Sequence, residues 1–328
     1  MNQTHLLTVN NLQTAFHTEA GAWLAVDGVN LQVKRGEILG LVGESGSGKS
    51  VTGFSLLGLI DPPGEVIEGQ VIFNGQDLRQ SSEEQLRQLR GDRIAMIFQD
   101  PLMTLNPVLK VGEQMMEAIF THYPQTSKAE ARQRCCDALA QVGIPAPESR
   151  LDNYPHEFSG GMRQRVAIAI AMLNKPDLII ADEPTTALDV TIQAQILYEI
   201  QKLCKEQNTA LIWITHDLGV VAELADNVAV MYAGRIVEYG AVDDVLSQPI
   251  HPYTQGLLNS MPGTSQPGTR LQQIDGMAPT LTGREQGCTF RPRCAQAHPS
   301  CADAPPPETH LAGRQYRCYF PLHLEVAS

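Results

Sequence analysis

The 328-residue sequence predicts an α/β fold with a glycine-rich loop between a strand and a helix, followed by a smaller irregular C-terminal region. Three observations carry this prediction. The apolar run 38–42 precedes the glycine-rich turn 43–50, which is followed by a helical pattern. The runs 178–181 and 210–214 are wholly apolar, as is typical of parallel strands buried on both faces. From about 261 onward proline, glycine and threonine become frequent and periodicity fades.

The segments around the glycine-rich turn read as antiparallel strands. Residues 5–38 contain short stretches of alternating polar and apolar residues, which predict a β subdomain leading into the turn. The dipeptide Asn74-Gly75 follows another apolar stretch and has the composition of a tight hairpin turn.

Helical periodicity dominates the middle of the chain. Apolar residues recur at helical spacing from about Ser81 to Arg90 and from Val111 to Val142, so an α-helical insert is expected in much of 105–172. With the composition change near 261, the sequence predicts a main domain over 1–262 and a C-terminal extension over 263–328.

Composition excludes several classes of protein. The net charge is −12, with 24 Lys and Arg against 36 Asp and Glu, and no basic cluster suited to a nucleic-acid backbone is present. No apolar window approaches the length of a membrane span, and the first residues lack the pattern of a signal peptide. We therefore expect a soluble cytoplasmic protein that does not bind nucleic acid.

The glycine-rich turn has the chemistry of a phosphate-binding loop. It matches G-x-x-x-x-G-K-[ST] at every fixed position, with Gly43, Glu44, Ser45, Gly46, Ser47, Gly48, Lys49 and Ser50. Glycines let backbone N–H groups converge on phosphates, and the following helix directs its positive end toward them. Lys49 adds a charge beside the terminal phosphate, and Ser50 can ligate magnesium. The loop predicts binding of a nucleoside triphosphate with Mg²⁺.

An acidic pair stands where ligands gather in open α/β sheets. Asp182 and Glu183 end the apolar run that begins at Leu178, so both carboxylates are expected at the carboxyl edge of a central strand. One acid can hold magnesium and the next can orient water. The segments Ser159-Gly160-Gly161 and Thr215-His216-Asp217 accompany this pair.

With these motifs in this order, residues 5–255 resemble the ATP-binding subunit of an ATP-binding-cassette transporter. The resemblance implies a RecA-like core with an antiparallel β subdomain and an α-helical subdomain. It also implies a magnesium site at Ser50, Gln99 and Asp182, and a catalytic carboxylate at Glu183 that polarises the attacking water.

The same resemblance assigns the remaining motif residues. His216 resembles the switch histidine that contacts the γ-phosphate, and Gln99 the glutamine that also senses the membrane partner. Asp189 resembles the dimer-contact aspartate. The signature, Ser159-Gly160-Gly161, implies that each chain completes the other subunit's ATP site in a head-to-tail dimer, with a copy of itself or with a second, similar ATPase.

Adenine recognition in this family usually uses an aromatic ring upstream of the loop. Phe16 fits the register of the first strand, and Trp23 is a larger ring nearby. We expect Phe16 to stack on adenine, with Trp23 as the alternative.

Longer stretches resemble the dipeptide and oligopeptide importer ATPases, among them 181–195, 230–235 and 251–254. This resemblance implies ATP hydrolysis that powers peptide import from the cytoplasmic side of the cell membrane. Two membrane permease subunits and, indirectly, a periplasmic or extracellular binding protein would be its partners. Nickel, glutathione and antimicrobial-peptide systems share these motifs, and a non-transport cassette is a further alternative.

The C-terminal region holds a candidate metal site. Four of the seven cysteines, Cys288, Cys294, Cys301 and Cys318, lie there without the C-x-x-C knuckles usual for zinc. Wide thiolate spacing suits an iron–sulfur cluster at least as well. The peptide-importer ATPases resemble this tail through residues 287–294, and that resemblance implies a [4Fe–4S] site.

Overall fold

The computed structural model describes residues 5–19, 21–100, 104–185, 190–261, 273–279, 281 and 285–323. The chain forms two compact units. The first unit contains Met1–Val33, Ile38–Gln80 and Trp213–Ser328, and the second contains Lys34–Glu37 and Ser81–Ile212. The C-terminal region thus belongs to the same unit as the strands at the N-terminal end.

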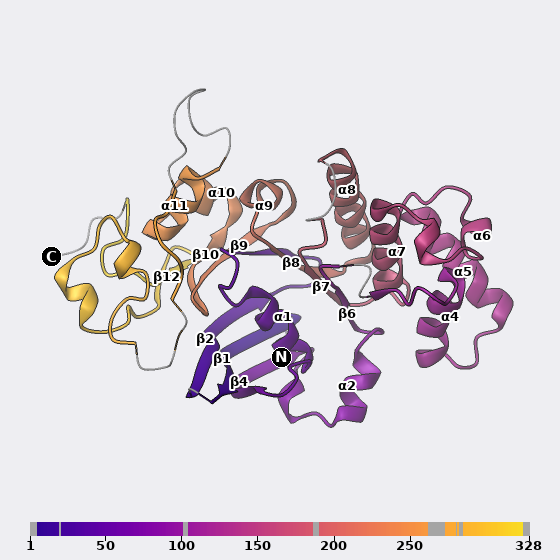
Figure 1. The fold of residues 1–328 in the computed structure, drawn as a ribbon, viewed down its shortest axis with the longest axis horizontal. Helices are drawn as coiled ribbons and strands as arrows, with labels where there is room; N and C mark the ends of the chain where they lie inside the picture. The colour runs from indigo at the N-terminus through magenta and orange to yellow at the C-terminus, as the bar shows by residue number, and fades with distance from the viewer. Residues whose placement is uncertain are drawn as a thin grey trace. The chain divides into compact units, whose positions relative to one another are not determined.

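An antiparallel sheet opens the first unit (Figure 1). Its strand order is β2-β1-β4-β5, with β1 (Leu7–Thr18), β2 (Gly21–Val33), β4 (Gly64–Phe73) and β5 (Gln76–Asp77). The strands are longer than the short stretches that alternation predicted, because β1 and β2 continue through irregular register around Leu12. The turn at Asn74 and Gly75, with φ of 49° and 81°, confirms the predicted hairpin.

The second group of strands in this unit surrounds β3 (Ile38–Val42), whose five residues are all buried. β3 pairs in parallel with β9 (Asn227–Tyr232), and β9 pairs antiparallel with β10 (Arg235–Ala241). Two short strands from the C-terminal region, β11 (Thr309–Leu311) and β12 (Arg314–Tyr316), extend this group through pairing of β12 with β10.

The helices of the first unit are α1 (Lys49–Leu57), α9 (Leu218–Leu224), α10 (Val242–Ser247) and α11 (Pro252–Asn259), with 3₁₀ turns η1 (Leu78–Gln80), η3 (Arg291–Arg293) and η4 (Pro299–Ala302). Asp217 caps α9 by accepting from the Gly219 N–H at 2.8 Å, which satisfies one of the helix's free donors. The core of this unit includes Leu281 and Phe290 as well as β9 residues. The C-terminal region is therefore packed into the hydrophobic core.

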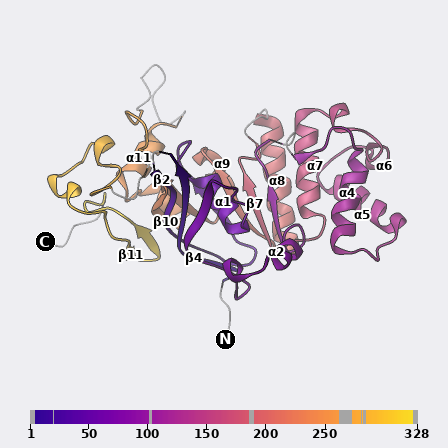
Figure 2. The ribbon, with the colours of Figure 1, turned by 60° about the horizontal axis from the view of Figure 1, so that its bottom comes forward.

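The second unit is mainly helical. Its strands β6 (Ile94–Ile97) and β7 (Leu178–Asp182) pair in parallel, and β8 (Ala210–Thr215) begins in this unit and ends in the first. The helices α4, α5, α6 and α7 lie together, as Figure 2 shows. The helices here are α2 (Glu83–Leu89), α4 (Val111–His122), α5 (Lys128–Gln141), α6 (Pro147–Arg150), α7 (Gly160–Met172) and α8 (Val190–Gln207), with the 3₁₀ turn η2 (Pro155–Glu157).

β7 and β8 each consist of one of the two apolar runs plus one polar residue, Asp182 or Thr215, and every residue of both strands is buried. This confirms the prediction of central strands covered on both faces. The predicted boundary near 262 falls in 262–272, outside the described residues, and stays a prediction. In the described part of the chain, no helix combines the length and apolar character needed to span a membrane.

A buried carboxylate fastens the C-terminal region to β10 within the first unit. Glu238 on β10 is 0% exposed and accepts hydrogen bonds from the Ile250 N–H at 2.8 Å and the His251 N–H at 2.9 Å. The guanidinium of Arg314, on β12, forms an ion pair with the same carboxylate. One side chain thus joins β10, the start of α11 and β12.

We predict that Glu238→Ala lowers the free energy of unfolding by about 3 kcal/mol, because it leaves the Arg314 cation without its carboxylate. Urea unfolding followed by circular dichroism measures this difference. Glu84→Ala breaks the exposed Glu84–Arg87 pair and serves as the control, with no measurable loss expected. Equal stability of the two variants would contradict the prediction.

Candidate nucleotide-binding and catalytic site

The phosphate-binding loop runs between β3 and α1 against two backbone carbonyls. A Cβ at Gly43 would stand 2.2 Å from the Met231 carbonyl oxygen, and one at Gly48 would stand 2.3 Å from that of Ala25. Gly48 also has φ of 103°, a conformation that favours glycine. Gly48 is the N-cap of α1 and provides no side-chain cap. The start of a helix suits phosphate through its N–H groups and its positive dipole end.

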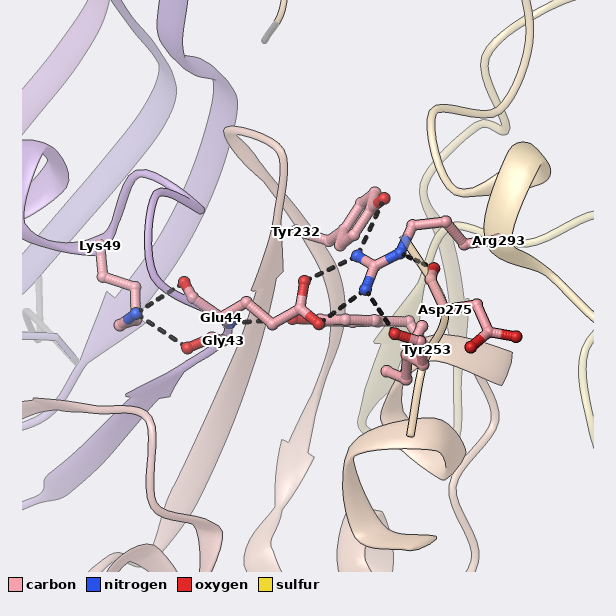
Figure 3. A network of polar contacts seen from close by, with 8 residues as sticks. Gly43, Glu44, Lys49, Tyr232, Tyr253, Asp275 and Arg293 are labelled. Carbon is pink, nitrogen blue, oxygen red and sulfur yellow. Dashed lines mark hydrogen bonds and ion pairs between the residues drawn. The ribbon is translucent and has the colours of Figure 1, made fainter. Parts of the chain in front are cut away.

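Lys49 lies within this loop and not in solvent. It is 5% exposed, and its Nζ donates to the carbonyl oxygens of Gly43 at 2.8 Å and Glu44 at 3.0 Å (Figure 3). In the described part of the chain, the buried Ser47 hydroxyl has no hydrogen-bond partner. A glycine cradle, a buried cation and an unsatisfied hydroxyl fit the triphosphate that the sequence predicted.

Two residues that the sequence did not single out for this site contact the loop. Arg293 from the C-terminal region pairs with the Glu44 carboxylate, and the hydroxyl of Tyr253 on α11 accepts from the Glu44 N–H at 2.9 Å (Figure 3). The sequence offered one signal for such a contact, which was Glu44 itself. An acidic side chain in a loop that binds an anion needs a positively charged partner.

The predicted acidic pair lies in the second unit. Asp182 is the last residue of β7 and 4% exposed, and Glu183 follows it with φ of 43°. A positive φ is uncommon for a residue with a side chain and is concentrated at functional sites. Gln99 Nε2 donates to Glu183 Oε2 at 3.4 Å, so the structure brings together two of the predicted catalytic residues.

The predicted signature begins α7. Ser159 is its N-cap and accepts from the Met162 N–H at 3.3 Å, and Gly160 is exposed with no atom within 4 Å of an added Cβ. The N-terminal end of this 13-residue helix is therefore open to solvent. Free N–H groups and the helix dipole suit a phosphate presented from outside.

His216 follows β8 and is exposed, directly before the α9 cap at Asp217. Asp189, the predicted dimer contact, lies outside the described residues. The loop and His216 belong to the first unit, whereas Gln99, Asp182 and Glu183 belong to the second. Their joint action on one nucleotide stays a prediction.

The two candidate aromatic rings stack on each other. Phe16 and Trp23 face one another across β1 and β2, with ring centroids 4.9 Å apart and planes inclined by 16°. Trp23 lines a pocket together with Glu44, Ser45 and Gly46 of the loop and with residues of the C-terminal region. Stacking of Phe16 on adenine, with Trp23 as the alternative, stays a prediction.

The four C-terminal cysteines, Cys288, Cys294, Cys301 and Cys318, line one small pocket together with Phe290. Burial raises the pKa of the Cys318 thiol to about 12, and it also raises that of Cys288. In the residues that the structure describes, no three or more His, Cys, Asp or Glu side chains are placed to hold a metal ion. The thiols are gathered in one place, but their arrangement is not that of a closed metal site.

Two other cysteines, Cys135 and Cys204, are buried free thiols. Cys135 and Cys204 are 0% exposed, and burial raises the pKa of each thiol to about 12. At neutral pH neither provides the thiolate that metal binding or oxidation requires.

Comparison with known families supports this interpretation of the site. A family model described as "ABC transporter" matches residues 26–186, and one described as "Oligopeptide/dipeptide transporter, C-terminal region" matches residues 237–301. The second match includes Tyr253 and Arg293, the two residues that contact Glu44 of the loop.

Curated relatives match almost the whole chain. The oligopeptide transport ATP-binding protein OppD of Salmonella typhimurium is 50% identical over 317 residues, covering 97% of this chain and 94% of that protein. The dipeptide transport ATP-binding protein DppD of Escherichia coli is 50% identical over 318 residues, covering 97% of each. AppD of Bacillus subtilis, an oligopeptide transport ATP-binding protein, is 48% identical over 316 residues, or 96% of each chain.

Solved structures show the same fold. The dimeric ATP-binding cassette MJ0796 bound to ADP and Pi matches with a TM-score of 0.65 and 28% identity, covering 72% of this chain and 98% of that chain. CbiO1 from Clostridium perfringens, part of the ABC transporter complex cbiONQ, matches with a TM-score of 0.64 and 28% identity, over 75% of this chain and 92% of that one. The chain is therefore an ATPase with the ABC cassette fold, and it belongs to the family of ATP-binding proteins of oligopeptide and dipeptide ABC transporters.

Proposed function

We propose that this chain hydrolyses ATP to power import of di- and oligopeptides across the cytoplasmic membrane through two separate permease subunits. The observation that carries the catalytic part is Glu183, held at a positive φ at the end of β7 beside Gln99. The cargo is supported by the identity of 50% to transport proteins named for oligopeptides and dipeptides. A binding protein outside the membrane would deliver the peptide, and this chain would sit on the cytoplasmic face.

In this mechanism the motif residues have the roles that the family resemblance implies. Lys49 and the N–H groups at the start of α1 hold the terminal phosphates, and oxygens of Ser50, Gln99 and Asp182 are suitable donors for Mg²⁺. The metal ion, when bound, neutralises charge on the phosphates. Glu183 orients and polarises the water that attacks the γ-phosphoryl group, and His216 contacts that group.

We predict that Glu183→Gln retains ATP affinity but lowers kcat by at least about 100-fold, because the amide cannot polarise water as a carboxylate does. Cells carrying this variant in place of the wild-type chain should lose uptake of labelled di- and oligopeptides. Wild-type turnover by the variant would contradict the role of Glu183.

The uptake measurement also tests the cargo. If the wild-type chain supports no peptide uptake while its ATPase activity is intact, the transporter carries another substrate, with nickel and glutathione tested next. Hydrolysis stimulated by nucleic acid and independent of any membrane subunit would instead favour a non-transport cassette.

We further propose that the signature acts in trans, on the ATP bound by the partner ATPase. Its exposure at the start of α7 supports this, since a Cβ added at Gly160 would point into open space.

Gly160→Ala tests this proposal. The substitution adds a Cβ into open space, so the isolated subunit should keep its melting temperature and its ATP affinity. ATPase activity of the assembled transporter should fall at least about tenfold, because the methyl group obstructs the partner's phosphate. Unchanged activity of the assembled transporter would place the signature outside the ATP site.

Finally, we propose that Cys288, Cys294, Cys301 and Cys318 bind a [4Fe–4S] cluster. Their common pocket supports this, and thiolates are the donors that such clusters require. The described arrangement of these thiols does not itself form a closed site, so cluster binding would require them to converge. The ATPase mechanism above uses none of these thiols.

We predict that protein purified without oxygen contains about four iron atoms per chain and absorbs visible light, and that Cys294→Ser loses both properties. Cys136→Ser, which alters a buried thiol outside the pocket, is the control and should retain iron. A colourless, iron-free wild-type protein would refute the cluster.

A further inference from the structure

The phosphate-binding loop carries a negatively charged side chain, although the ligand expected there is itself an anion. Glu44 is the second residue of the loop, and a free carboxylate there would repel an anionic triphosphate. In the structure its two oxygens face the guanidinium of Arg293, with Nη1 to Oε2 at 2.7 Å and Nη2 to Oε1 at 2.9 Å. This two-point geometry is the strongest that an arginine and a carboxylate can form. The Glu44 charge is thus matched from the C-terminal region.

Arg293 is fixed independently of Glu44. Its Nε donates to the Asp275 carbonyl oxygen at 2.8 Å, and its Nη2 also donates to that of Ile274 at 3.2 Å. The guanidinium carbon lies 5.7 Å from the centre of the Tyr232 ring, and the side chain is 5% exposed. The cation therefore has one defined position, from which it determines where Glu44 can lie.

Glu44 in turn touches the phosphate-binding lysine. Its carbonyl oxygen accepts from Lys49 Nζ at 3.0 Å, while its N–H donates to the Tyr253 hydroxyl at 2.9 Å (Figure 3). Burial raises the pKa of this tyrosine, so its hydroxyl stays neutral and can accept from an N–H. The carboxylate, the N–H and the carbonyl oxygen of Glu44 therefore each have a hydrogen-bond partner. A shift of Arg293 would move Glu44 and with it the carbonyl that holds Lys49.

We propose that Arg293 is a positioning residue for ATP binding. It neutralises Glu44 and fixes that residue, and thereby sets the phosphate-binding loop and Lys49 for the triphosphate. This role concerns nucleotide affinity and is independent of the transported cargo.

A double-mutant cycle with Arg293→Gln, Glu44→Gln and both together tests this proposal. ATP affinity of the isolated full-length chain is measured by calorimetry with Mg-ATP, and kcat and KM are measured in the assembled transporter. Arg293→Gln should weaken ATP binding about tenfold, because it leaves the Glu44 carboxylate unpaired beside the phosphates. KM should rise in proportion while kcat changes less than about threefold.

The double variant distinguishes positioning from general folding support. Removing the carboxylate as well should restore ATP affinity to within about threefold of Glu44→Gln alone, since no unpaired charge remains. If both variants that contain Arg293→Gln are equally impaired, Arg293 only supports folding of the C-terminal region. ATP affinity within about twofold of wild type for Arg293→Gln would also overturn the proposal.

Arg293→Lys keeps the test decisive if the glutamine variant does not fold. Lysine retains the charge but cannot form the two-point contact, so ATP affinity should fall between the wild-type value and that expected for Arg293→Gln. Melting temperature confirms that the variant is folded. Wild-type affinity in a folded Arg293→Lys chain would show that the geometry of the pair is irrelevant.

Discussion

The phosphate-binding loop is fixed because its backbone packs directly against the backbone of neighbouring strands. The candidate nucleotide site of the first unit depends on this close packing. At Gly43 and Gly48 the loop passes so near to the carbonyls of Met231 and Ala25 that any side chain would collide with them. The parallel pairing of β3 with β9 holds one of these carbonyls in place, and β2 provides the other. The loop is thus supported by backbone on both sides, directly before the start of α1.

The C-terminal region reaches this loop through a small aromatic cluster. Tyr232, Tyr253 and Phe290 have ring centroids between 4.6 and 5.4 Å apart, and each ring comes from a different segment. His251 lies against Phe290 and is completely buried. Burial lowers its pKa to about 3, so the neutral ring can accept the Tyr253 N–H at Nδ1. A region with few apolar residues is thus anchored by a few large rings and by polar contacts such as that of Glu238.

In the second unit, β7 has an ion-paired carboxylate before its first residue and a residue with a strained backbone after its last. Before the strand, Asp177 pairs with Arg35 and Arg93. Burial alone would raise the pKa of Asp177, but the hydrogen bonds from these arginines outweigh it and lower the pKa, so the carboxylate stays charged. After the strand, Glu183 adopts its positive φ next to Gln99. A strand anchored at one end can hold a strained residue at the other.

The sequence by itself determined the elements whose signals are local. Apolar runs located β3, β7 and β8, because strands covered on both faces need apolar residues throughout. The spacing of glycines and Lys49 identified the phosphate-binding loop, since that chemistry is contained in eight consecutive residues. Only the tertiary structure decided that Arg293, about 250 positions further on, neutralises Glu44, and that the C-terminal region is built into the core of the first unit. Contacts between distant segments depend on packing of the whole unit, and no periodicity or spacing in the sequence encodes them.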